Sequence, residues 1–224
     1  MRLWFGLVVG VVGVGILLSL GTWQTKRLFW KLDRLERIDT EIAAAPVPLA
    51  AALEPEFRRY APVEATGQFG QGHIRVLATR TSIGAVYRII RPFVTDQGRE
   101  VMVDTGWQLQ SRTVAEAPQG RLSLTGNLDA PQEVDGFIPS PDLAGNIWFA
   151  RDVPAMAQVL GTEPVLVVLR DGPETDLGVT LWPIDTAGIS NNHLQYAITW
   201  FSLALIWAAM TIYFLLLTRR RSPR

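Results

Sequence analysis

Hydrophobic residues are concentrated at the two ends of the chain, and polar residues are concentrated between them. No charged residue occurs from position 3 to position 20, a run close to the roughly 20 apolar residues that carry a helix across a bilayer. A second uncharged run covers residues 196–217 and is followed closely by Arg219. Trp23, Tyr196 and Trp200 stand at the ends nearer the middle of the chain, where interfacial aromatic residues are common. We therefore predict two transmembrane helices, within residues 1–25 and 191–218.

A cleaved signal peptide is the alternative for the first run, because residues 19–21 form a small-x-small pattern. The apolar core of a signal peptide is usually about 7–15 residues long, and this run is longer. We expect the segment to be retained as a membrane anchor.

Each predicted membrane helix carries a face that another helix could approach closely. At about 100° per residue, the first face holds Gly6, Gly10, Gly13, Leu17, Gly21 and Gln24. The second face holds His193, Ala197, Trp200, Ala204 and Ala208. Small residues at such faces let membrane helices pack against each other. Antiparallel packing of the two faces would bring Gln24 and His193 to the same end of the pair.

A helical apolar stripe continues beyond the first run among charged residues, through Leu28, Leu32, Leu35, Ile38 and Ile42. Pro46 and Pro48 then stop a helix. We predict a helical stalk over residues 26–45, and a partner-binding coiled helix is the alternative.

The segment 46–190 changes to short apolar runs separated by turn residues, which is typical of β-structure. We expect strands near residues 63–66, 74–78, 86–94, 101–104, 122–128 and 165–169. Asp96-Gln97-Gly98 is a hairpin-type turn, and Asp152 is typical of the N-cap of a short helix through Leu160. The predicted fold class is a membrane protein in which two transmembrane α-helices flank a β-rich (α+β) extracytoplasmic domain. Both a barrel and a sandwich remain open for this domain.

Charge near the membrane segments predicts the orientation. The basic tail, residues 219–224, favours the cytoplasmic side. Five basic residues between positions 26 and 37 point the other way. Long segments translocate largely regardless of their charge, so we predict cytoplasmic termini and an outer β-rich domain.

Composition excludes several function classes. Acidic and basic residues balance at 21 each, so no overall field steers the chain toward nucleic acid. Cysteine is absent and histidine occurs twice, which argues against disulfides, thiolate chemistry and an all-protein transition-metal cluster. No nucleophile elbow, phosphate loop or dinucleotide fingerprint occurs. We interpret Glu133 and Asp135 as solvated loop charges and His73 as a surface residue, and we expect no catalytic machinery.

His193 is the candidate for chemistry, because imidazole is a common axial ligand of haem iron. The alternative is a structural role, in which His193 anchors the helix at the interface while Asn191 and Asn192 satisfy its first-turn amides.

Two motifs carry a resemblance that covers essentially the whole chain. Residues 20–24 (Leu-Gly-Thr-Trp-Gln), with Arg27 and Lys31, and the block 191–201 resemble the Surfeit locus protein one family. Sparser landmarks between them are Tyr60, Val63, Gly67, Phe69, Pro92, Gly98, Gly106 and Trp107. Similar proteins usually have an Asn-Arg pair before the Gly-Trp, whereas this chain has Asp104-Thr105. That departure puts in doubt any function carried over to this turn.

The resemblance implies a non-enzymatic assembly factor for haem–copper cytochrome c oxidase in the inner membrane, with its central domain in the periplasm. Such a protein would bind haem a transiently and assist its insertion into subunit I, with haem a synthase and the lipid bilayer as further partners and no nucleic acid. Carried to this chain, the axial ligand is His193, and we expect Trp23, Gln24 and Trp200 as walls of the site. A haem-free scaffold for subunit I is the alternative. An enzyme of the haem pathway is disfavoured, because no catalytic group is evident.

Overall fold

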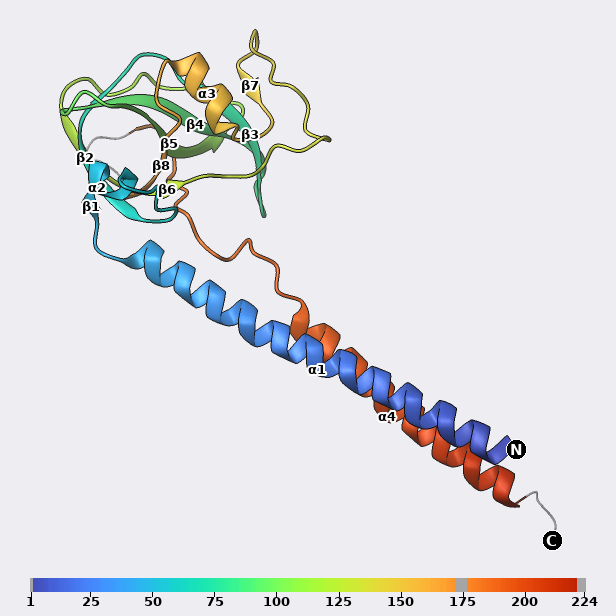
Figure 1. Cartoon of the computed structure of the whole chain (residues 1–224). Coiled ribbons are helices and arrows are strands. Elements are labelled where there is room, and N and C mark those ends of the chain that lie inside the picture. Colours follow the sequence, from blue (N-terminus) through green and yellow to red (C-terminus); the bar gives the residue numbers. More distant parts are fainter. Residues whose placement is uncertain (1, 172–176, 221–224) are drawn as a thin grey trace. The chain divides into compact units, whose positions relative to one another are not determined.

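The computed structural model describes residues 2–171 and 177–220, so the end of the predicted basic tail, residues 221–224, lies outside the described residues (Figure 1). The helices are α1 (Arg2–Ala43), α2 (Leu49–Leu53), α3 (Val153–Leu160) and α4 (His193–Arg220). The strands are β1 (Val47–Pro48), β2 (Pro62–Phe69), β3 (Ile74–Arg80), β4 (Gly84–Thr95), β5 (Glu100–Leu109), β6 (Leu122–Asp129), β7 (Ile147–Trp148) and β8 (Leu166–Asp171). The chain forms two compact units: a helix pair, which is α1 up to Arg37 with α4, and a barrel domain, Ile38–Asp185.

The helix pair is antiparallel, and small residues of α1 face bulky residues of α4. A Cβ atom added at Gly6 would meet Phe214, one at Gly13 would meet Trp207, and one at Gly21 would meet Phe201. Residue numbers rise along α1 as those of their partners fall along α4, so the two helices run in opposite directions (Figure 1). Ala197 and Ala204 are buried on the α4 side. Antiparallel packing of the glycine face on α4 and burial of Ala197 and Ala204 are therefore confirmed, whereas the bulky residues that meet the glycines lie outside the predicted α4 set.

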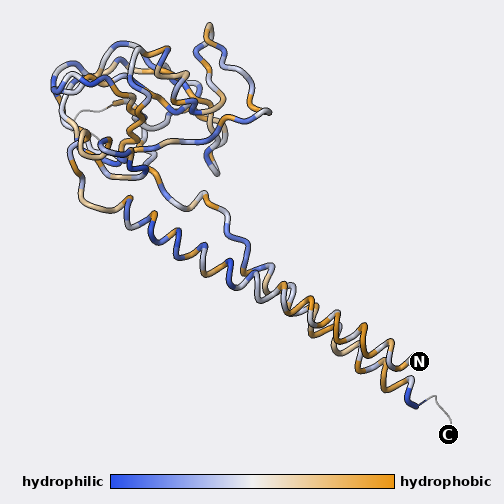
Figure 2. The backbone as a smooth tube through the Cα atoms, in the orientation of Figure 1, coloured by the Kyte–Doolittle hydropathy of each residue, from blue (hydrophilic) through white to orange (hydrophobic). Residues whose placement is uncertain are grey.

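Both helices are long and apolar enough to cross a membrane, by length and composition. Hydropathy changes part way along α1, where the apolar half gives way to a charged half (Figure 2). The helix continues unbroken through the residues predicted as a stalk and ends at Ala43. The predicted boundaries at residues 25, 45, 190 and 218 divide the chain into parts inside and outside a bilayer, and they stay predictions.

The barrel domain is a closed ring of strands. Its strand order is β1-β2-β6-β8-β5-β4-β3-β7, and β2 also pairs antiparallel with β4. This second pairing joins Gly67 to Thr95 and Phe69 to Phe93, so β2, β6, β8, β5 and β4 close on themselves. Because the strands close, the domain is a barrel and not a sandwich. β3 and β7 extend the sheet beyond β4.

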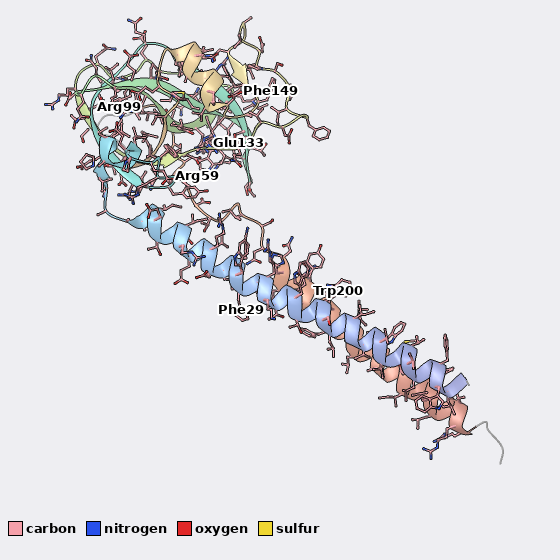
Figure 3. The ribbon with its side chains drawn as sticks, viewed as in Figure 1. Phe29, Arg59, Arg99, Glu133, Phe149 and Trp200 are labelled. Carbon is pink, nitrogen blue, oxygen red and sulfur yellow. The ribbon has the colours of Figure 1, made fainter. Side chains whose placement is uncertain are left out.

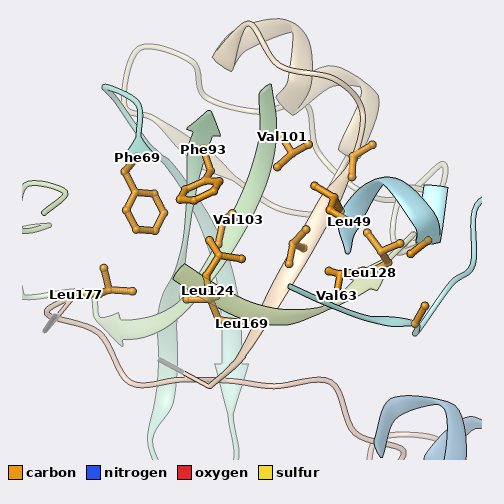
Figure 4. Packing of buried hydrophobic residues seen from close by; sticks show 14 residues of the cluster. Leu49, Val63, Phe69, Phe93, Val101, Val103, Leu124, Leu128, Leu169 and Leu177 are labelled. Atoms are coloured by element: carbon orange, nitrogen blue, oxygen red, sulfur yellow. The ribbon is translucent and has the colours of Figure 1, made fainter. Parts of the chain in front are cut away.

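Two apolar layers stabilise this domain. Side chains that alternate along β5 and β8, including Val101, Val103 and Val167, fill the barrel interior (Figure 4). Their neighbours Met102 and Leu166 face the other way and pack with Met156 of α3. Because both faces of these strands are buried, their sequences are continuous apolar runs instead of an alternating pattern.

Local sequence signals determine the short helix and the strands, as predicted. The side chain of Asp152 accepts a hydrogen bond from the backbone N–H of Ala155 at 3.1 Å, and α3 ends at Gly161 in the left-handed conformation. This pair of caps confirms the predicted helix. The predicted strands are also present, most of them longer than their apolar cores.

The end of α1 is held within the barrel domain by side chains from two strands. The amide of Asn127 donates to the carbonyl oxygens of Ile42 at 3.0 Å and of Tyr60 at 2.9 Å. Arg170 Nη1 also donates to the Ile42 oxygen, at 3.3 Å. These bonds satisfy carbonyl groups that a helix C-terminus otherwise leaves without partners.

Candidate functional site

The helix pair brings together two polar side chains that lie far apart in sequence, as the geometry of the two faces predicts. His193 Nδ1 lies 2.8 Å from Gln24 Oε1. Gln24 is 9% exposed, and His193 is half-buried at the first position of α4. An amide oxygen only accepts hydrogen bonds, so this contact is a hydrogen bond in the tautomer whose Nδ1 carries the proton. The other ring nitrogen, Nε2, then has a free lone pair and suits a metal ion.

Small residues one helical turn away make this contact geometrically feasible. Gly21 precedes Gln24 by about one turn, and a Cβ there would lie 2.7 Å from Cε1 of Phe201. Ala197, about one turn after His193, is 5% exposed. The helices therefore touch directly beside the polar pair. A macrocycle bound by His193 would lie against the outside of the helix pair, because side chains fill the seam.

The two predicted tryptophan walls occupy different faces. Trp200 follows His193 by roughly two turns, so it shares the face of His193 and is half-buried (Figure 3). Trp23 precedes Gln24 by one residue, about 100° around α1, and is 57% exposed. Trp200 thus stands beside the seam, and Trp23 stands outside it. Tyr196, 52% exposed, adds an accessible ring on the first turn of α4.

Asn191 does not satisfy a first-turn amide of α4. Its Oδ1 atom is buried and has no hydrogen-bond partner among the described residues. The first turn is closed by the backbone, with Tyr196 N–H donating to the carbonyl oxygen of Asn192 at 3.1 Å. An unsatisfied acceptor therefore lies two residues before His193.

The donor set at this end of the helix pair, one free imidazole nitrogen with exposed aromatic neighbours, fits a haem group.

In the barrel domain, the residues that depart from the family pattern have structural roles. Asp104 ends the predicted strand 101–104 and Thr105 was expected in the turn that follows it, but both lie fully buried within β5. Asp104 Oδ2 accepts from Arg88 Nε at 2.6 Å, and Thr105 Oγ1 donates to the Ile89 oxygen at 2.9 Å. The turn prediction was wrong because the strand continues through a register shift opposite Ile89 and Ile90.

Glu133 is an exposed loop charge, as the sequence predicts, and it also pairs with Arg151. Its carboxylate accepts from the backbone N–H and Nε of Arg151, both at 2.9 Å. Burial pushes the pKa of Glu133 upward, but the hydrogen bonds and charge of Arg151 outweigh burial and lower it. Asp135 Oδ1 accepts from the Phe137 N–H at 2.8 Å in a local turn. Both carboxylates are thus exposed, as predicted, and both also accept hydrogen bonds from the chain.

His73 is half-buried and lines a polar cavity together with Arg91. Burial lowers the pKa of His73, and the charges of Arg91 and Arg75 lower it further. Sequence reasoning missed Arg91. The available signal was an arginine enclosed by apolar residues on both sides in the 86–94 strand run.

Comparisons with known proteins agree on one family. A model of the SURF1 family matches residues 11–205. Surfeit locus protein 1 of Xenopus tropicalis is 30% identical over 210 residues, which span 83% of this chain and 67% of that protein. Surfeit locus protein 1 of Homo sapiens is 28% identical over 224 residues, spanning 90% and 73%. A bacterial relative, the SURF1-like protein of Rickettsia conorii, is 28% identical over 200 residues, spanning 85% and 82%.

Proposed function

The chain belongs to the SURF1 family, known as cytochrome c oxidase assembly factors, and we propose that it is a non-catalytic membrane protein that binds haem a and assists its insertion into subunit I. The observation that carries this proposal is the hydrogen bond between Gln24 and His193. It joins the two motifs on which the family resemblance rests. We therefore infer that the two motifs share one role, which is to form a ligand site at the end of the helix pair.

In this proposal His193 holds the haem iron through Nε2. Gln24 accepts the Nδ1 proton, which fixes the tautomer and the orientation of the ring. Hydrogen bonds of this kind raise the basicity of a ligating imidazole. Gln24 is itself held in place by burial against α4. The pair thus presents one oriented axial donor.

A carrier must release its cargo, and the site offers what reversible binding needs. One strong protein ligand leaves the other axial position exchangeable. Trp200 provides aromatic surface on the face of His193, and Trp23 provides a second, exposed aromatic surface on another face. The apolar faces of α1 and α4 provide a surface for the farnesyl tail. We propose that haem a synthase supplies the cargo and that subunit I receives it.

The site lies where the apolar part of α1 ends. Gln24 precedes the first charged residue after the apolar run, Lys26, by two positions. An apolar helical segment from Leu3 to Thr25 is about 34 Å long at 1.5 Å per residue, enough to cross the hydrocarbon core. We propose an inner-membrane protein with both termini in the cytoplasm, so that His193 lies near the periplasmic face. Retention of the first segment follows from this proposal, because α1 supplies Gln24.

The test is the haem content of the full-length protein purified from a host that makes haem a. The wild type is expected to carry a haem absorption spectrum, and His193→Ala is expected to lose it. Leu194→Ala is the matched control, since Leu194 is the next residue on α4 and is 56% exposed. Unchanged haem content and spectrum in His193→Ala would overturn the ligand assignment.

A haem-free scaffold is the second candidate, and the exposed loop 130–146 favours it. Phe137 is 95% exposed, Leu143 62% and Val134 56%. Apolar side chains exposed in this way are typical of protein contact sites. The scaffold role predicts that changes in this loop impair oxidase assembly while the purified wild type carries no absorbing cofactor.

A further inference from the structure

Arg91 is a buried cation with no counter-charge among the described residues. Its side chain lies in β4 and is 3% exposed. The guanidinium donates one hydrogen bond, from Nη2 to the carbonyl oxygen of Ala115. Its Nε atom is buried and has no hydrogen-bond partner in the part of the chain that the structure describes. A neutral carbonyl oxygen does not compensate a full positive charge, and an uncompensated charge is costly to bury.

The other buried arginine of the same strand has a different environment. Arg88 pairs with the carboxylate of Asp104 at 2.6 Å. β4 therefore carries one buried arginine that pairs with a carboxylate, Arg88, and one, Arg91, that pairs with none among the described residues. Burial lowers the pKa of Arg91, and no carboxylate raises it in compensation.

Arg91 also lines a cavity, which gives an external anion a place to bind. The cavity has a volume of about 580 Å³, within the usual range for small-molecule sites. Its walls come from the end of β2, the loop between β2 and β3, β4 and the loop before β6. The lining residues with polar side chains are Gln68, Gln71, His73, Arg91, Glu116 and Gln119.

The field in this cavity is positive near His73. Burial, then Arg91 and then Arg75, lower the pKa of its imidazole. Among the described residues, Glu116 is the one carboxylate that lines the cavity, and it makes no ion pair with Arg91 there. His73 therefore lines the same cavity as a guanidinium that has no carboxylate partner among the described residues.

We propose that this cavity binds a small oxyanion, a carboxylate- or phosphate-bearing molecule whose negative charge pairs with Arg91. A guanidinium fork matches the geometry of both groups, and side-chain amides on the walls supply further hydrogen bonds. The site lies within the barrel domain and is independent of haem binding at His193.

The chain contains two histidines, so imidazole NMR signals of the full-length protein give a direct test. The protein, labelled with ¹³C-histidine in detergent, is titrated with sodium phosphate or sodium acetate against sodium chloride of equal ionic strength. His73→Gln assigns the two signals. We expect a saturable shift of the His73 signal and a rise in its pKa of about one pH unit, since an anion beside the ring favours its charged form.

Arg91→Gln is expected to weaken the saturable response at least tenfold, and Arg91→Lys to retain part of it. A response to either probe supports the site, and the tighter probe identifies the ligand class. Identical His73 titrations in chloride, phosphate and acetate would overturn the proposal, and this wild-type comparison holds even where an Arg91 variant does not fold. An unchanged response in folded Arg91→Gln would also overturn it.

Discussion

Replacing Gly10 by alanine tests the packing that brings Gln24 and His193 together. A Cβ atom at this position would lie 2.1 Å from Cγ2, 2.8 Å from Oγ1 and 3.0 Å from Cβ of Thr211. Thr211 has little freedom to move away, because its side chain is β-branched and its Oγ1 donates to the Trp207 oxygen at 2.8 Å. The helices themselves must therefore separate.

The size of the effect follows from these distances. Carbon atoms in van der Waals contact are about 3.5–4.0 Å apart, so the pair must open by roughly 1.5 Å at this point. Overpacking of this kind costs about 1–3 kcal/mol, which weakens helix association by roughly 5- to 150-fold. Gly15→Ala is the matched control, because a Cβ there meets nothing within 4 Å.

Spin labels on α1 and α4 measure the separation directly. The chain has no cysteine, so labels can be placed on Val12→Cys and Ile206→Cys, which are 53% and 54% exposed. Pulsed electron paramagnetic resonance is expected to give a longer and broader distance distribution for Gly10→Ala than for Gly15→Ala. Identical distributions for the two variants would refute the packing argument.

Three further changes probe the polar groups. Asp104→Asn leaves buried Arg88 without its carboxylate and is expected to cost about 3–5 kcal/mol, measured by denaturant unfolding. Glu133→Gln is expected to flatten the acid limb of the pH–stability curve: the lowered pKa of Glu133 stabilises the fold above its ordinary value of 4.5, and this stabilisation is lost as pH falls through the folded-state pKa. Gln24→Leu removes the acceptor of His193 and is expected to weaken haem a affinity about 10- to 100-fold, measured by spectral titration.

Each of these predictions has a control variant or an outcome that would contradict it. Glu41→Gln breaks the more exposed ion pair with Arg58, 2.7 Å in length, and should cost less than about 1 kcal/mol. Equal costs for Asp104→Asn and Glu41→Gln would contradict the role of burial. An unaltered acid limb in Glu133→Gln would show that its pKa is not lowered. Thr22→Ala, an exposed position near Gln24, should leave haem affinity unchanged.

Features that depend on local spacing could be predicted from sequence. The helix pair follows from small residues repeated at helical spacing, and α3 follows from Asp152 as its cap. Both signals act within a few residues of each other along the chain. The meeting of Gln24 and His193 also follows from them, because two faces and an antiparallel order leave one arrangement.

Features that depend on pairing between distant residues could not be predicted from the sequence. Barrel closure rests on hydrogen bonds between the end of β2 and the end of β4, which no periodicity reveals. The role of Asp104 depends on Arg88, which lies 16 residues away on the neighbouring strand. Arg91 is similar: its sequence context shows an arginine in an apolar run, but the lack of a counter-charge is a property of the folded domain.

Chemical rescue tests the proposed ligation of haem iron by His193. Full-length His193→Gly is mixed with haem a in detergent, with and without imidazole, and its absorption spectrum is compared with that of the wild type. We predict that the variant lacks the wild-type spectrum alone and regains it when imidazole replaces the missing side chain. A wild-type spectrum in His193→Gly without imidazole would contradict the account.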